Sequence, residues 1–197
     1  MTGISLNHLT FSTLRAAIVA FGVLLAGLAA TSSAAAQDTY SSQEIVDSGH
    51  RFFGATSGSL ATLVEKIFAT YGLPNGYVLG EGGSGAIVGG LTYGEGMLFT
   101  KNAGDHKVFW QGPSVGWDFG GDGARTMMLV YNLDRVDALY RRFVGVSGSA
   151  YFVAGLGFTA LKHGDIILVP IKTGLGARLG VNVGYLKLTQ KPTWNPF

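Results

Sequence analysis

The stretch GEGGSGAIVGG, residues 80–90, decides the interpretation of the chain, because its first glycines match a dinucleotide-binding fingerprint. Gly80, Gly82 and Gly85 have the G-x-G-x-x-G spacing. Such glycines hold a pyrophosphate only where a helix begins directly after them, since the helix N-terminus supplies the amide groups. The residues that follow, AIVGGLTYG at 86–94, are β-branched, aromatic and glycine-rich. They predict a strand, which argues against nucleotide binding.

Glycine is abundant along the whole chain. The sequence has 31 glycines in 197 residues, and pairs such as Gly155 and Gly157 stand inside strand-like runs. Glycine within a strand marks bends, bulges and close approach of two backbones. These features allow a sheet to curve and close, which removes its edges. We therefore predict a small closed antiparallel β-barrel of about eight strands.

The N-terminus is typical of a secretory signal peptide. Arg15 precedes an uncharged apolar run from Ala16 to Ala30, and small residues follow as far as Ala36. This order of parts predicts export to the periplasm with cleavage after Ala36, and an uncleaved membrane anchor is the alternative. The chain has no cysteine, so packing and hydrogen bonds alone must stabilise the exported part.

The remainder divides into three segments. Residues 37–75 predict two helices: Ser41 and Glu44 have capping-box spacing, and a stripe of apolar residues follows from Leu60 to Tyr71. Residues 76–189 predict the glycine-rich barrel, interrupted by an inserted helix at about 132–143 that Asn132 would cap. Residues 190–197 predict an irregular tail. The expected fold class is mainly β with helices (α+β).

Charge is distributed unevenly along the exported part. Residues 37–139 contain 6 basic and 11 acidic residues, whereas residues 140–197 contain 7 basic residues and one acidic residue. The asymmetry indicates a basic surface for an anionic lipid or envelope polymer, unless the two halves neutralise each other in space. Nucleic acid is not expected as a partner. The candidate ligand-binding residues are Arg125, Arg141, Arg142, Lys162, Lys172, Arg178 and Lys187, with Trp117 as an aromatic candidate.

The sequence contains parts of catalytic and metal-binding motifs, but the neighbouring residues that such motifs require are missing. The serine of GPSVG at 112–116 is not followed by a helix, as a nucleophile elbow requires. Asp118 and Asp122 lack the spacing of a calcium loop, and His50, His106 and His163 are isolated in a chain without cysteine. We predict no metal, no cofactor and no enzymatic activity.

Two acidic arrangements leave alternatives open. Glu81 and Glu95 are either a buried carboxylate pair or polar residues on the solvent face of the barrel. An envelope-modifying hydrolase would use Asp118, Asp122 or Glu81 together with His163.

The sequence resembles two known protein families. GPSVGWDFGG at 112–121, MMLVYNLD at 127–134 and GLGARLGV at 174–181 resemble the SYLF lipid-binding module, which implies lipid contact. From Gln43 to Leu188 the chain is similar to the alphaproteobacterial envelope integrity protein A family. That resemblance implies a small periplasmic β-barrel with helices that keeps the cell envelope intact, with no described catalytic residues.

We therefore expect an exported, non-enzymatic barrel that supports the envelope, with lipid or polymer binding through its basic half. One alternative is an integral outer-membrane β-barrel, because about 161 residues fit eight strands. The inserted helix and Pro192 and Pro196 argue against it. The second alternative is the envelope-modifying hydrolase.

Overall fold

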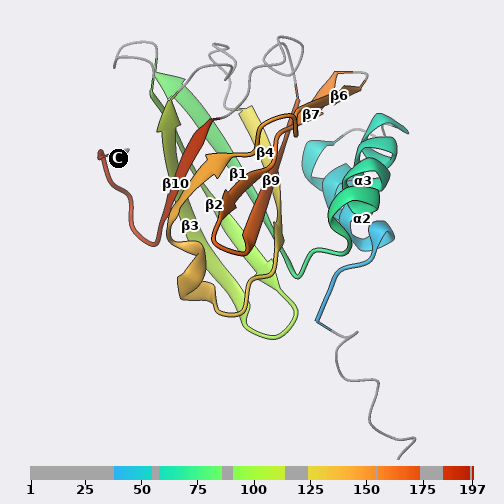
Figure 1. Ribbon diagram of the computed structural model, residues 1–197, viewed down its shortest axis with the longest axis horizontal. Helices are drawn as coiled ribbons and strands as arrows, with labels where there is room; N and C mark the ends of the chain where they lie inside the picture. Colours follow the sequence, from blue (N-terminus) through green and yellow to red (C-terminus); the bar gives the residue numbers. More distant parts are fainter. Residues whose placement is uncertain are drawn as a thin grey trace, which may run out of the picture. The chain divides into compact units, whose positions relative to one another are not determined.

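The computed structural model describes residues 38–54, 58–85, 91–113, 124–153, 155–173, 184–195 and 197. Ten strands in this part of the chain form one antiparallel sheet (Figure 1). They are β1 (Gly76–Gly85), β2 (Leu91–Thr100), β3 (Gly104–Pro113), β4 (Ala124–Tyr131), β5 (Arg142–Gly145), β6 (Tyr151–Val153), β7 (Leu156–Phe158), β8 (Leu161–His163), β9 (Ile166–Thr173) and β10 (Tyr185–Thr189).

Eight of these strands close a ring. The order is β4, β1, β2, β3, β10, β5, β8 and β9, and β9 pairs with β4 to complete the circle. β7 continues the edge that β8 occupies on β9: Phe158 lies opposite Ile171, and Leu161 lies opposite Leu168. The short β6 pairs with β7 alone and projects from the ring toward the helices (Figure 1). The prediction of a closed antiparallel barrel of about eight strands is confirmed.

Where the helices cover the barrel, the sheet is apolar on both its inner and its outer face. In β4, Met128 and Val130 point into the barrel interior, whereas Met127, Leu129 and Tyr131 point outward under the helices. Successive side chains of a strand alternate between its faces. A strand covered on both faces therefore has an uninterrupted apolar sequence.

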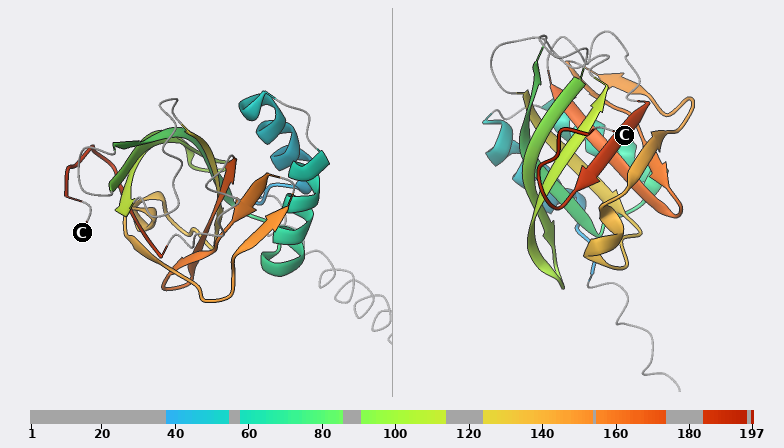
Figure 2. Two further views of the ribbon diagram at one scale, coloured as in Figure 1. Left: turned by 90° about the horizontal axis from the view of Figure 1, so that it is seen from above. Right: turned by 90° about the vertical axis from the view of Figure 1, so that its left-hand side faces the viewer.

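Two helices cover the outer face at β4, β7 and β9. They are α2 (Ser42–Phe53) and α3 (Gly58–Tyr71), and Figure 2 shows both on the same side of the ring. The predicted capping box is present: the Ser41 amide donates to Glu44 Oε2 at 2.8 Å, and the Glu44 amide donates to Ser41 Oγ at 3.3 Å. The α3 stripe buries Leu63, Val64 and Ile67 completely.

The prediction of an inserted helix at 132–143 was wrong. The segment forms only a four-residue 3₁₀ turn, η1 (Val136–Leu139), before β5 begins at Arg142. Asn132 does not cap a helix; it adopts a left-handed conformation with φ of 58°. The Asn75 side chain donates to the Leu133 carbonyl at 2.9 Å and accepts from the Leu133 amide at 3.1 Å. Both backbone groups that a helix would use are thus bound by a distant side chain.

The apolar stripe of this segment packs into the barrel. Leu133, Leu139 and Phe143 are buried in the same cluster as the inward residues of the strands. The segment crosses the lower end of the barrel in Figure 1. These residues are thus apolar because they are buried in the barrel interior, although their spacing also fits one face of a helix.

Gly80 and Gly82 of the fingerprint face the indole of Trp110. A Cβ atom at Gly80 would lie 2.7 Å from Cη2 of Trp110, and one at Gly82 would lie 3.3 Å from its Nε1. Trp110 is fully buried in the interior cluster. At Gly80 a Cβ atom would also overlap backbone atoms of Glu95 and Gly96 on β2. These glycines therefore leave space for a large side chain inside the barrel and for close approach of the neighbouring strand, as expected for glycine in a curved sheet.

Candidate functional site

Three basic residues lie on the outer surface of adjacent strands. Phe143, Leu161 and Leu186 point inward, so by alternation their chain neighbours Arg142, Lys162 and Lys187 point outward. Lys187 of β10 lies directly opposite Arg142 of β5, and Lys162 of β8 lies opposite Val144 of β5. We call this surface, formed by Arg142, Lys162, Lys187, Val144 and Val146, the basic face.

The basic face has little internal charge compensation. Lys187 Nζ donates to the backbone oxygens of Asn195 at 2.9 Å and Phe197 at 2.8 Å. Among the described residues, no carboxylate lies within ion-pair distance of Arg142 or Lys162. Val144 and Val146 beside them are 58% and 40% exposed. At Arg142 and Lys162 the surface therefore combines positive charge that has no carboxylate partner among the described residues with exposed apolar area.

Other predicted ligand-binding residues lie elsewhere. Arg125 on β4 donates to the Phe52 carbonyl at 2.9 Å and faces Glu81 at 3.7 Å, so it connects α2 to the barrel. Arg141 precedes β5 and donates to the Tyr140 carbonyl at 3.3 Å.

Three predicted ligand-binding residues remain: Lys172, Trp117 and Arg178. The backbone of Lys172 on β9 lies opposite Thr126 and Gly157. Trp117 and Arg178 lie outside the described residues. Of the predicted site residues, the structure thus brings Arg142 and Lys162 together with Lys187.

The proposed acidic arrangements occupy separate positions. Glu81 and Glu95 lie opposite each other on β1 and β2, with side chains 64% and 60% exposed. They form ion pairs with Arg125 and, at 3.3 Å, with Lys107, as expected for the solvent face.

The hydrolase residues are not brought together either. His163 on β8 is separated from Glu81 on β1 by β9 and β4, and its Nδ1 lies 2.8 Å from the Arg142 carbonyl oxygen. Asp118 and Asp122 lie outside the described residues. Within the described ranges, no three metal-ligating side chains gather.

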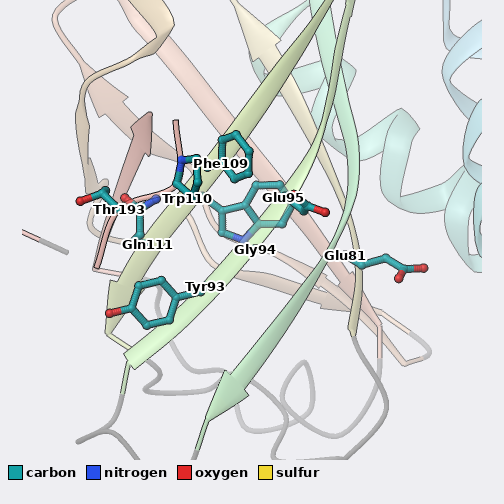
Figure 3. Close-up of a pocket in the computed structure, with 9 residues that line it drawn as sticks. Glu81, Tyr93, Gly94, Glu95, Phe109, Trp110, Gln111 and Thr193 are labelled. Carbon is teal, nitrogen blue, oxygen red and sulfur yellow. The ribbon is translucent and has the colours of Figure 1, made fainter. Parts of the chain in front are cut away.

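A groove that was not predicted lies on the outer surface of the barrel. The groove has a volume of about 330 Å³. Its strand residues come from β1, β2 and β3, and the tail contributes Pro192 and Thr193 (Figure 3). The residues come from segments far apart in the sequence, so no local pattern could reveal it. No helix in the described part of the chain is long and apolar enough to cross a membrane.

The fold defines the class: a closed antiparallel eight-stranded β-barrel with two helices on its outer face. The chain belongs to the family of envelope integrity protein A, whose model matches residues 38–197. A crystal structure of a beta-barrel-like, uncharacterized protein from Brucella abortus is similar, with 69% sequence identity and a TM-score of 0.78. The match covers 81% of this chain and 99% of that chain. No curated protein matches.

Proposed function

We propose that this protein is an exported, non-enzymatic barrel that supports the cell envelope by binding an anionic envelope component through the basic face. Membership of the envelope integrity protein A family supports the envelope role. The N-terminal sequence supports export to the periplasm. The observation that carries the binding proposal is the pair Arg142 and Lys162, unpaired with any carboxylate in the described ranges.

The arrangement of this face suits an anionic surface. Like charges directly opposite each other on neighbouring strands are destabilising, yet Lys187 and Arg142 occupy such positions. Lys187 Nζ already donates to oxygens of Asn195 and Phe197, so a bound phosphate or carboxylate would be held mainly by Arg142 and Lys162. Basic residues near an anionic lipid surface each contribute about 1 kcal/mol, and the exposed Val144 and Val146 would contribute apolar contact.

The outer surface argues against the membrane-barrel alternative. A transmembrane barrel needs an apolar band of about 25 Å around its outside. Here Glu81, Glu95 and Lys107 lie exposed on β1–β3, and two helices cover β4 and β9. The hydrolase alternative has no geometric support among the described residues, because His163 and Glu81 are on separate parts of the ring.

Co-sedimentation with vesicles tests the proposal. The protein should sediment with vesicles of phosphatidylglycerol and phosphatidylcholine and not with phosphatidylcholine alone, and salt should weaken the binding. Polygalacturonate in solution distinguishes a polymer ligand: it should bind the protein if the acidic chain rather than the bilayer is recognised. Equal, negligible binding to both vesicle types would contradict the proposal that the ligand is a lipid. If the protein also failed to bind polygalacturonate, the proposal that the basic face binds an anionic ligand would be wrong.

Charge reversal locates the binding surface. The double variant Arg142→Glu/Lys162→Glu should lower the affinity by about tenfold or more. Arg135→Glu/Lys107→Glu is the matched control, because it makes the same change in net charge at residues that are already ion-paired. Similar losses in both variants would mean that only total charge matters.

A further inference from the structure

The groove on β1–β3 has aromatic side chains in its walls, and one of them contacts an exposed tryptophan of the tail. Tyr93 and Phe109 line it, and Pro192 of the tail closes one side. The Trp194 ring lies 5.4 Å from the Tyr93 ring at an interplanar angle of 64°, and the Tyr93 hydroxyl donates to the Trp194 carbonyl at 3.0 Å. Trp194 is nevertheless 82% exposed. A large aromatic side chain held in place and left in solvent is suited to contact with a ligand.

The polar groups of the groove include one buried acceptor without a partner. Gln111 is almost fully buried, and its Nε2 donates to Thr189 Oγ1 at 3.0 Å. Its Oε1 has no hydrogen-bond partner in the described part of the chain. Leaving a buried acceptor unpaired costs about 1–3 kcal/mol. A ligand whose N–H or O–H donor reached this buried oxygen from the groove would remove the cost.

The charges of the groove argue against a cationic ligand. Glu95 and Glu81 belong to the lining, but Lys107 and Arg125 already pair with them. Their oxygens still have capacity to accept hydrogen bonds, because an ionised carboxylate offers about four acceptor positions. The groove thus offers aromatic walls and acceptors with nearly balanced charge.

We propose that this groove binds a neutral N-acetylated saccharide. A sugar ring has an apolar C–H face that packs on aromatic rings and hydroxyl groups that donate to carboxylates, and an acetamido N–H is the donor that Gln111 lacks. The volume of about 330 Å³ is at the lower end of the range for ligand pockets, which suits a short saccharide. We call two aromatic residues the platform: Tyr93, which lines the groove, and Trp194, which packs edge-on against Tyr93 beside it. The groove borders the basic face, because Lys187 lies opposite Gln111 and binds the tail at Asn195, so each site is tested by its own variant.

Titration of the full chain with tetra-N-acetylchitotetraose tests this site, with maltotetraose as the comparison. Calorimetry should give a Kd of about 1 mM or tighter for the N-acetylated sugar, and weaker binding of maltotetraose. Binding should also protect Trp194 from acrylamide quenching. No binding of the N-acetylated sugar at about 10 mM, or equal affinity for maltotetraose, would overturn the proposal.

Substitution of Trp194 tests whether the platform contributes to saccharide binding. Trp194→Ala should weaken binding about fivefold or more without changing the unfolding temperature, because the side chain is exposed. Phe152→Ala on β6 is the matched control, because Phe152 is an exposed aromatic residue, at 42%, outside the groove. Unchanged affinity in Trp194→Ala would overturn the role of the platform. Vesicle binding by Trp194→Ala should stay at the wild-type level, so the two proposals fail separately.

Discussion

The indole of Trp110 on β3 occupies the space into which a side chain at Gly94 on β2 would point. The two residues are register partners, and Trp110 is fully buried. A Cβ atom at Gly94 would overlap Cε2, Cζ2 and Nε1 of the indole. Alanine has a better intrinsic preference for strands than glycine, so any large loss of stability in Gly94→Ala must come from this overlap.

We predict that Gly94→Ala lowers the free energy of unfolding by about 1–3 kcal/mol, the usual cost of overpacking. Urea denaturation measures the change. Gly184→Ala is the control, since a Cβ atom at Gly184 would have no heavy atom within 4 Å and the residue has no positive φ; its effect should be small. In the double variant Gly94→Ala/Trp110→Leu, the two losses should not add. Full additivity would contradict the packing explanation.

The glycines correctly predicted the fold, but the reason why glycine is needed at particular positions could not be predicted. Their number and spacing predicted a curved, closed sheet. Sequence could not show that Gly80, Gly82 and Gly94 all face one indole, because Trp110 belongs to a different strand. Register between strands decides which residues meet, and it depends on the whole sheet.

Asn75 determines how the chain leaves β4. Its side chain binds both the amide and the carbonyl of Leu133. Asn75→Ala should lower the free energy of unfolding by about 1–3 kcal/mol, because partly buried backbone groups lose their partners. Asn75→Asp keeps the acceptor for the Leu133 amide but places a carboxylate oxygen against the Leu133 carbonyl oxygen, so it should also be destabilising. Exposed Asn102 provides the control Asn102→Ala, and thermal unfolding in which either Asn75 variant is as stable as Asn102→Ala would contradict this role.

The inserted segment shows why helical spacing was misleading here. Leu133, Leu139 and Phe143 follow a spacing that favours a helix. A contact from residue 75, 58 positions earlier, holds the backbone out of the helical conformation, and no local pattern contains that information.

The basic face was predictable in part. Composition indicated a basic C-terminal half, and Arg142 and Lys162 were among the predicted ligand residues. The exposure of Val144 and Val146 was not predictable, because the segment was expected to be helical up to residue 143 and the strand pairing of β5 with β8 and β10 was unknown.

Glu44 stabilises the start of α2 in a pH-dependent way. The Ser41 amide, the Lys101 ammonium and the Ser41 hydroxyl all bind the Glu44 carboxylate, and these contacts lower the pKa of Glu44. A folded pKa below the unfolded value of about 4.3 means that the contribution is fully present above that value. The contribution is lost as pH falls through the folded pKa.

The stability difference between wild type and Glu44→Ala should therefore be larger at pH 7 than at pH 3, as measured by urea denaturation. Ser41→Ala should cost about 1 kcal/mol at neutral pH. A difference for Glu44→Ala that is constant between pH 7 and pH 3 would contradict the assignment.

Tyr131 places a hydroxyl between the barrel and α3 without a hydrogen-bond partner among the described residues. Burial raises the pKa of Tyr131, and the neighbouring Tyr71 adds to the shift. Tyr131→Phe removes a buried polar group without a partner, so it should leave the free energy of unfolding at pH 7 unchanged or raise it by up to about 1 kcal/mol. Tyr140→Phe is the contrast, because its hydroxyl donates to the Lys107 carbonyl at 3.2 Å, and its loss should destabilise the protein.

The Tyr131→Phe variant also separates the alkaline titration of Tyr131 from that of the other tyrosines. Because the folded pKa lies above the unfolded value of about 10, the stability contribution of the neutral phenol is present below pH 10. It is lost as pH rises from there toward the folded pKa. Wild type should therefore lose stability relative to Tyr131→Phe between about pH 10 and pH 11, as measured by urea denaturation at each pH. Parallel curves for the two proteins, or a loss of more than about 1 kcal/mol in Tyr131→Phe at pH 7, would show that the hydroxyl has a partner in solution.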